Sequence, residues 1–142
     1  MNQQISEQQL IQLIQREESI LQSQQQFFQN IKTTLRETHE TIESLKEIQN
    51  KPQKIFFKLG IGVLIEAELK NSGKCKRAFS ETGFKEEKIE DTIKWLEKRK
   101  INLETQAGKI QTELFKTEQK INEMINIAQQ IQIDKNKNVS VK

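Results

Sequence analysis

The stretch IFFKLGIGVLIEAEL, residues 55–69, decides the fold because it differs from the sequence on both sides. It is apolar, contains several β-branched residues and is interrupted by Gly60 and Gly62, whereas its flanks are long and polar with widely spaced aliphatic residues. After Gly62 the apolar residues come close to alternating with polar ones, which is typical of a half-buried strand. We therefore expect β-structure in the middle of a chain that is otherwise helical.

Two turn-forming segments follow and divide this region, residues 54–88, into two hairpins. Lys70–Gly73 and Ser80–Gly83 contain the Asn, Ser and Gly residues that favour turns, so strands are expected at 74–79 and 84–88. Hairpins of this size are marginal in isolation, and their free edges invite pairing with other chains. We predict an oligomer built on a shared β-platform, and the alternative is a monomer whose hairpins fold back on each other. The residues predicted to face the platform are Ile55, Phe57, Leu59, Val63, Ile65, Phe79 and Phe84.

The flanks carry heptad repeats, which predict a helix over 3–50 and a second helix over 89–134, followed by a frayed tail, 135–142. Pro52 marks the exit from the first helix. The two helices have similar lengths and a short central segment between them, so we expect an antiparallel coiled-coil hairpin. In the predicted register Ile42 lies opposite Leu96, and Ile14 lies opposite Met124. The residues that recur every seven positions in the first helix are Ile14, Leu21, Phe28, Leu35 and Ile42.

Composition agrees with one elongated domain, residues 1–142, of a mainly α class with a small β insert. The chain is 30% charged and 34% hydrophobic, with a mean hydropathy of −0.75, which suits long helices with narrow apolar seams better than a compact core. No run approaches the roughly 18 apolar residues of a membrane span, and the first residues do not resemble a signal peptide. We expect a cytoplasmic protein, with a nuclear location as the alternative.

Catalysis, a metal and a cofactor are not expected. His39 is the only histidine, and Cys75 has no base in its neighbourhood to activate it. Both signs of charge interleave along the chain, which argues against a nucleic-acid partner. The short basic cluster Lys74–Arg77 leaves contact with nucleic acid or with an acidic partner as a weaker alternative.

The central residues resemble the α-class subunits of the prefoldin family. Leu59-Gly60, Gly83-Phe84 and Glu87-Lys88 stand at the positions of that family's strand and turn motifs, and Lys98–Ile101 resembles the basic cluster early in its second helix. Lys94–Lys98 is similar to a segment of the related, prefoldin-like ubiquitously expressed transcript proteins.

Two features depart from the family pattern. The second hairpin, Phe79–Glu86, is far more polar than the apolar hairpin usual in the family. Ile89 stands where the family often has a capping Ser or Thr and cannot itself cap a helix, so the second helix is expected to start less sharply, or further on with Asp91 or Thr92 as its cap.

The resemblance implies a hexamer of two α-class and four β-class subunits with a double β-barrel platform and six helical tentacles. Such an assembly would hold unfolded proteins, notably actin and tubulin, and pass them to a cytosolic chaperonin without ATP. The alternative is a scaffold or adaptor subunit of a prefoldin-like complex associated with a chaperone–ATPase system and the transcription machinery.

The tips of the two helices, residues 5–21 and 121–133, carry more aliphatic residues than a heptad seam can bury. Glu17 and Gln24 occupy seam positions, which we expect to loosen this end of the coiled coil. Loose aliphatic and Met-containing surface suits promiscuous binding, and the alternative is packing against a neighbouring helix or simple exposure. The predicted client-binding residues are Ile5, Leu10, Leu13, Ile14, Met124, Ile125, Ile127 and Ile131, and Ile11, Ile20 and Ile133 also lie in this region.

Overall fold

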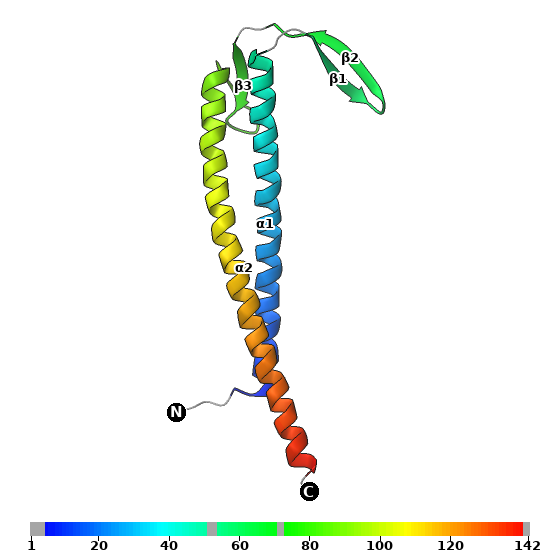
Figure 1. The fold of residues 1–142 in the computed structure, drawn as a ribbon, viewed down its shortest axis with the longest axis vertical. Coiled ribbons are helices and arrows are strands. Elements are labelled where there is room, and N and C mark those ends of the chain that lie inside the picture. Colours follow the sequence, from blue (N-terminus) through cyan, green and yellow to red (C-terminus); the bar gives the residue numbers. More distant parts are fainter. Residues whose placement is uncertain (1–4, 51–53, 71–72, 141–142) are drawn as a thin grey trace. The chain divides into compact units, whose positions relative to one another are not determined.

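A computed structural model describes residues 5–50, 54–70 and 73–140 of the chain. Two long helices enclose two small antiparallel hairpins in the sequence, which confirms the predicted class (Figure 1). Predictions that concern residues 3–4, Pro52, the turn residues 71–72 and residues 141–142 fall outside this description. The elements are α1 (Glu7–Asn50), β1 (Lys54–Gly60), β2 (Val63–Glu68), β3 (Lys74–Ala78), β4 (Phe84–Lys88) and α2 (Ile89–Ser140).

Helix α1 begins at Glu7 because Ser6 caps it. The backbone N–H of Gln9 donates to Oγ of Ser6 over 3.2 Å, and the backbone N–H of Ser6 donates to Oε1 of Gln9 over 3.0 Å. This reciprocal pair is a capping box, which satisfies two amides at the helix start. Residues 5 and 6 therefore precede the helix, although the heptad pattern extended the prediction to residue 3.

Helix α2 begins directly after β4, and the second hairpin takes the place of a cap. The backbone N–H of Ile89 donates to the carbonyl oxygen of Gly73 over 3.0 Å, so the first amide of the helix is satisfied from across the hairpin. Glu90 and Asp91 place negative charge in the first turn, where the helix dipole favours it. The expectation of a later start capped by Asp91 or Thr92 is therefore wrong.

Helix α2 also continues to Ser140, so residues 135–140 are helical rather than frayed. Lys135 forms an ion pair with Glu7 of α1, and Nε2 of Gln130 donates to Oδ1 of Asp134 one turn later over 3.1 Å. These polar contacts stabilise the helical turns beyond the last apolar seam residue. The spacing of apolar residues in the sequence does not reveal them.

The contacts divide the chain into two units, and both helices contribute to each. Unit 1 comprises residues 1–32 and 105–142, and unit 2 comprises residues 33–104. In unit 1 the core consists of Leu10, Ile121 and Met124. The half-buried residues that pack against this core are Ile14, Leu21, Ile125, Ala128 and Ile131. Ile14 and Met124 thus share one cluster, as the predicted register requires.

In unit 2 the core joins the C-terminal part of α1, the first turns of α2 and one residue of β3. Its buried members are Ile42, Ile89, Ile93 and Leu96, and Leu45, Ile48 and Cys75 pack against them. Ile42 and Leu96 share this cluster, in agreement with the predicted register. Cys75 attaches the β3–β4 hairpin to the helices, and Figure 1 shows β3 beside them.

The two hairpins form separate two-stranded antiparallel sheets. Strand β1 pairs with β2 through a two-residue turn, Ile61-Gly62, in which Gly62 has a φ of +70° that favours glycine. A register shift between Lys58 and Gly60 leaves Leu59 without a partner at the end of the ladder. Strands β3 and β4 pair in continuous register from Lys74 with Lys88 to Ala78 with Phe84. The shared barrel belongs to an oligomer and stays a prediction for this chain.

Candidate functional site

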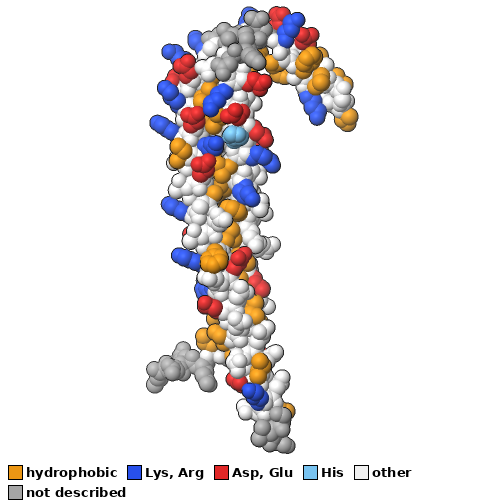
Figure 2. Space-filling view, viewed as in Figure 1, with side chains coloured by type: hydrophobic (Ala, Val, Ile, Leu, Met, Phe, Trp, Pro, Cys, Tyr) orange, Lys and Arg blue, Asp and Glu red, His pale blue; other side chains and the backbone are white. Residues whose placement is uncertain are grey.

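The β1–β2 hairpin presents one apolar face, on which two side chains are exposed and two are half-buried. Ile55 pairs with Ala67 and Phe57 pairs with Ile65, and because directly paired residues point to the same side, these four form one face. Phe57 and Ile65 remain 50% and 49% exposed. Figure 2 shows apolar side chains gathered over this hairpin. A sheet face of this kind is unfavourable in water and indicates an interface.

The other predicted platform residues are also exposed. Leu59 and Val63 lie at the turn end of the first hairpin, and Phe84 begins β4. Phe79 lies over the second turn, where a Cβ on Gly83 would approach its Cζ to 2.5 Å, so only glycine allows this ring position. Each of the seven platform residues has accessible surface that an assembly could bury, and their role in an assembly stays a prediction.

A polar network fixes the inner face of the β3–β4 hairpin on α2. Nε of Arg77 donates to Oε1 of Glu87 over 2.7 Å, and Oγ1 of Thr92 donates to the same oxygen over 2.7 Å. The Arg77 guanidinium lies 4.2 Å from the centre of the Trp95 ring, and Sγ of Cys75 lies 3.1 Å from Oγ1 of Thr92. The hydrogen bonds from Arg77 and Thr92 lower the pKa of Glu87 below its usual value.

This network was missed by the sequence reasoning, which considered Cys75 and its basic neighbours only as candidate chemistry. The alternation of Cys75 and Arg77 on one face is visible in the sequence. The partners Glu87 and Thr92 become apparent only once the register of β3 with β4 and the start of α2 are known. Cys75 acts here as a packing residue, in keeping with its contacts to the core of unit 2.

In unit 1, the aliphatic residues predicted to bind clients fall into three groups. Ile5, Leu13 and Ile127 are exposed, and Ile14, Ile125 and Ile131 are half-buried. Leu10 and Met124 are only 3% and 9% exposed because they form the seam between the helices. These two residues therefore do not belong to the exposed surface, which instead includes Ile11, Ile20 and Ile133.

A shallow groove marks the start of α1 within this surface. It has a volume of about 440 Å³ and is lined by Ile5, Gln9, Gln12, Leu13 and Arg16. Two aliphatic side chains, two amides and one guanidinium can contact an apolar side chain and hydrogen-bond to the peptide backbone beside it. The polar members of this groove did not figure in the sequence prediction, because glutamines are common throughout α1.

Polar residues interrupt the seam of unit 1, as predicted. Glu17 keeps its carboxylate largely buried and accepts a hydrogen bond from Nζ of Lys120 over 2.8 Å. Oε1 of Gln24 is buried and has no hydrogen-bond partner among the described residues. Thr117 is buried too, but its Oγ1 donates to the carbonyl oxygen of Glu113 in its own helix. An unpaired buried oxygen lowers the stability of the seam.

The remaining polar groups supply no cluster for metal binding in the part of the chain that the structure describes. His39 has Nδ1 at 3.3 Å from Nζ of Lys100, a lysine that interrupts the seam of α2. No three His, Cys, Asp or Glu side chains gather there as a metal would require. Within the same residues, neither long helix is apolar enough to pass through a bilayer.

Two long helices that flank two small antiparallel hairpins in the sequence define a class of mainly helical proteins with a small β insert. The prefoldin subunit family model matches residues 14–134, so the chain belongs to the prefoldin family. Its fold is similar to that of a chain in the cryo-EM structure of filamentous PFD from Methanocaldococcus jannaschii, with a TM-score of 0.66 and 13% identity. That match covers 81% of this chain and 97% of the other. The sequence matches no curated protein.

Proposed function

We propose that this protein is a subunit of a hexameric, cytoplasmic prefoldin-type co-chaperone. Family membership implies assembly with other prefoldin subunits, and the proposal adds α-class character with two α-class and four β-class subunits. The complex binds unfolded proteins such as actin and tubulin at its helical tips and delivers them to a cytosolic chaperonin without ATP. The subunit needs no cofactor and catalyses no reaction.

The observation that carries the proposal is the exposed aliphatic surface of unit 1. Ile5 just before α1, Ile11 and Leu13 on α1, and Ile127 and Ile133 on α2 remain exposed, although the seam beside them is buried. Aliphatic side chains without directional hydrogen bonds accept many sequences, which suits a protein that binds non-native chains. The groove beside Leu13 adds two glutamine amides that can hydrogen-bond to an extended backbone.

The test of client binding is suppression of the aggregation of denatured actin. The double variant Leu13→Ser/Ile127→Ser removes two exposed side chains of the proposed surface and spares its buried seam. The matched control, Phe27→Ser/Phe115→Ser, removes two exposed aromatic side chains from other positions on the same helices. We expect the first pair to lose most of the suppression and the second to retain it, and equal losses would contradict a localised binding surface.

Assembly through the first hairpin has its own test, because adjacent residues of β2 point to opposite faces. Ile65 lies on the apolar face, whereas Leu64 lies on the other face opposite Lys58. Ile65→Glu places a charge in the proposed platform and is expected to release the subunit from a co-expressed complex. Leu64→Glu makes the same change on the other side and is expected to leave the complex intact by light scattering.

The polar second hairpin favours one second candidate, a scaffold subunit in a prefoldin-like complex linked to a chaperone–ATPase system. That function predicts fixed partners and no suppression of aggregation. Affinity purification from cells followed by mass spectrometry separates the two. Recovery of β-class subunits and chaperonin supports the co-chaperone, whereas recovery of AAA+ ATPases and a polymerase supports the scaffold.

A further inference from the structure

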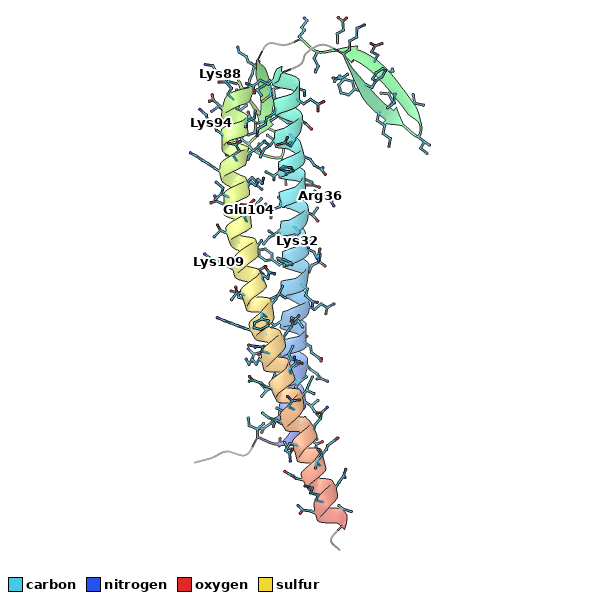
Figure 3. The ribbon with its side chains drawn as sticks, viewed as in Figure 1. Lys32, Arg36, Lys88, Lys94, Glu104 and Lys109 are labelled. Atoms are coloured by element: carbon cyan, nitrogen blue, oxygen red, sulfur yellow. The ribbon has the colours of Figure 1, made fainter. Side chains whose placement is uncertain are left out.

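One column of exposed apolar side chains on α1 lies beside the seam of unit 1. Leu13, Ile20 and Phe27 follow one another at intervals of seven residues and are 38%, 37% and 51% exposed. Residues at this spacing lie in line along one face of a helix, about 10.5 Å apart. We call these three residues the lateral stripe. All three belong to unit 1, and the stripe ends shortly before Lys32, which Figure 3 labels on α1.

The stripe widens the apolar face of α1 beyond what one partner helix covers. The seam residues Ile14, Leu21 and Phe28 come one position later and are half-buried. Nζ of Lys32 lies 5.4 Å from the centre of the Phe28 ring, whereas the neighbouring Phe27 ring stays half exposed. A two-helix coiled coil needs two apolar positions per heptad, and a third is typical of helices that pack in larger bundles. This part of α1 therefore has a face for a second helix besides α2.

Cationic side chains border the stripe between Leu13 and Ile20. Arg16 comes three residues after Leu13 and four before Ile20, so it adjoins both on the helix surface, and it is exposed. On the other side Glu17 adjoins the same two residues, and its largely buried carboxylate accepts a hydrogen bond from Nζ of Lys120 on α2 over 2.8 Å. The Lys120 side chain stays 60% exposed. Two cations against one carboxylate leave positive charge at this level, which favours acidic flanks on a helix laid along the stripe.

The spacing of the stripe selects a helical occupant. Apolar residues that recur every seven positions in a helix also lie about 10.5 Å apart, so they match the three stripe residues in register. In an extended strand, side chains on one face recur about every 6.7 Å, and no multiple of that distance meets the middle residue of the stripe. The shallow groove at the start of α1 continues the stripe, since Leu13 belongs to both.

We propose that the lateral stripe binds an amphipathic helix of a partner protein, so that three helices pack together in unit 1. The bound helix has aliphatic residues at three positions spaced by seven and acidic residues between two of them. Leu13 and Ile20 also belong to the aliphatic tip surface, whereas Phe27 lies beyond the tip, residues 5–21. Binding one helix in a defined register differs from holding non-native chains, and it does not depend on the co-chaperone function.

The experiment measures fluorescence anisotropy of a labelled peptide, Ala-Leu-Ala-Ala-Glu-Glu-Ala-Ala-Leu-Ala-Ala-Glu-Glu-Ala-Ala-Leu-Ala-Ala, with the full-length protein. A second peptide exchanges the middle leucine with the alanine two positions further on, which turns this leucine by about 200° and keeps the composition. We expect the first peptide to bind about tenfold more tightly, because all three of its leucines reach the stripe. No detectable binding of the first peptide up to about 1 mM protein, or equal binding of both peptides, overturns the proposal.

Two pairs of serine substitutions test the location of the site. Ile20→Ser/Phe27→Ser removes two stripe residues and should weaken binding of the first peptide about tenfold. Ile11→Ser/Phe115→Ser removes the same two residue types from exposed positions outside the stripe and should retain binding within about twofold. Circular dichroism checks that both variants keep their helix content. Equal weakening by both pairs overturns the proposal, and a lower particle mass of the first pair alone, by light scattering, overturns it in favour of a second copy of the chain.

A charge exchange keeps the proposal falsifiable if the first serine pair is poorly folded. Arg16→Glu should weaken the first peptide about threefold and strengthen the same peptide with lysines in place of its glutamates by a similar factor. Absent or opposite changes overturn the assignment of an acidic helix. Phe27→Ser/Phe115→Ser, which is expected to keep the suppression of actin aggregation, should still bind the first peptide more weakly than the wild-type protein does. The helix site and the client site can therefore fail independently.

Discussion

Replacing Gln24 with leucine should stabilise the protein, even though the change replaces a polar side chain with an apolar one. Oε1 of Gln24 is buried in unit 1 with no hydrogen-bond partner among the described residues. The position belongs to the heptad seam, three residues after Leu21, where leucine is the usual occupant. The substitution removes an unsatisfied oxygen and places apolar carbon in the seam.

The expected gain follows from the two changes. Relief of an unsatisfied buried acceptor is worth about 1–3 kcal/mol. Gln24 makes no side-chain hydrogen bond among the described residues, so the replacement leaves no protein donor or acceptor unpaired there. Leucine has nearly the same size as glutamine, so overpacking should cost less than about 1.5 kcal/mol. The net expectation is a rise of about 1–2 kcal/mol in the free energy of unfolding.

Urea unfolding followed by circular dichroism measures this change, with Gln25→Leu as the matched control. Gln25 is the next residue, is exposed and has the same helix propensity, so its replacement should move the free energy of unfolding by less than about 0.5 kcal/mol. A lower stability for Gln24→Leu, with an unchanged control, would refute the reasoning. It would mean that the oxygen has a partner or that the seam does not close at this layer.

Three further changes test other parts of the structure. Gly108→Ala should raise the free energy of unfolding by about 1 kcal/mol, because a Cβ at this helical position meets nothing within 4 Å. A lower thermal unfolding temperature would point to a contact that the added methyl group blocks. Ile93→Ala should lower it by about 2–5 kcal/mol, because Ile93 is buried in the core of unit 2; a loss below 1 kcal/mol in urea would show that this core is not closed. The pKa of Glu87 is lowered in the folded protein, so its ion pair stabilises the fold above the usual pKa of 4.5, and this contribution is lost as the pH falls through the lowered value. Glu87→Gln should therefore flatten the pH dependence of the thermal unfolding temperature below pH 4.5. An unchanged pH profile would contradict the assignment of Arg77 as the partner of Glu87.

The helices and strands were largely predictable because each follows a simple period. Heptad spacing marked the seam residues Ile42 and Leu96, and near-alternation around Gly62 marked the first hairpin. The helix ends were harder. The cap at Ser6 comes from a local polar motif, and the start at Ile89 depends on the carbonyl oxygen of Gly73, which a helical pattern cannot reveal.

The candidate surfaces were predictable in kind but not residue by residue. The excess of aliphatic residues at the tips was apparent from the sequence. Which of them enter the seam depends on the exact rotation of the helices, and that rotation buries Leu10 and Met124 while it exposes Ile11. The pairing of Arg77 with Glu87 required the register of β3 with β4, since the two residues are ten positions apart.

The bond between the Ile89 amide and the Gly73 carbonyl oxygen has a consequence for the order of folding. It closes a loop of only sixteen positions, so the β3–β4 hairpin and the first turn of α2 can form together as a local nucleus. The pair of Glu7 with Lys135, in contrast, joins residues 128 positions apart. Contacts of short sequence separation form fastest, so we expect the two helices to zip from residues 42 and 96 towards the chain ends. The arms that we propose for client binding would then be the last part of the protein to fold and the first to open.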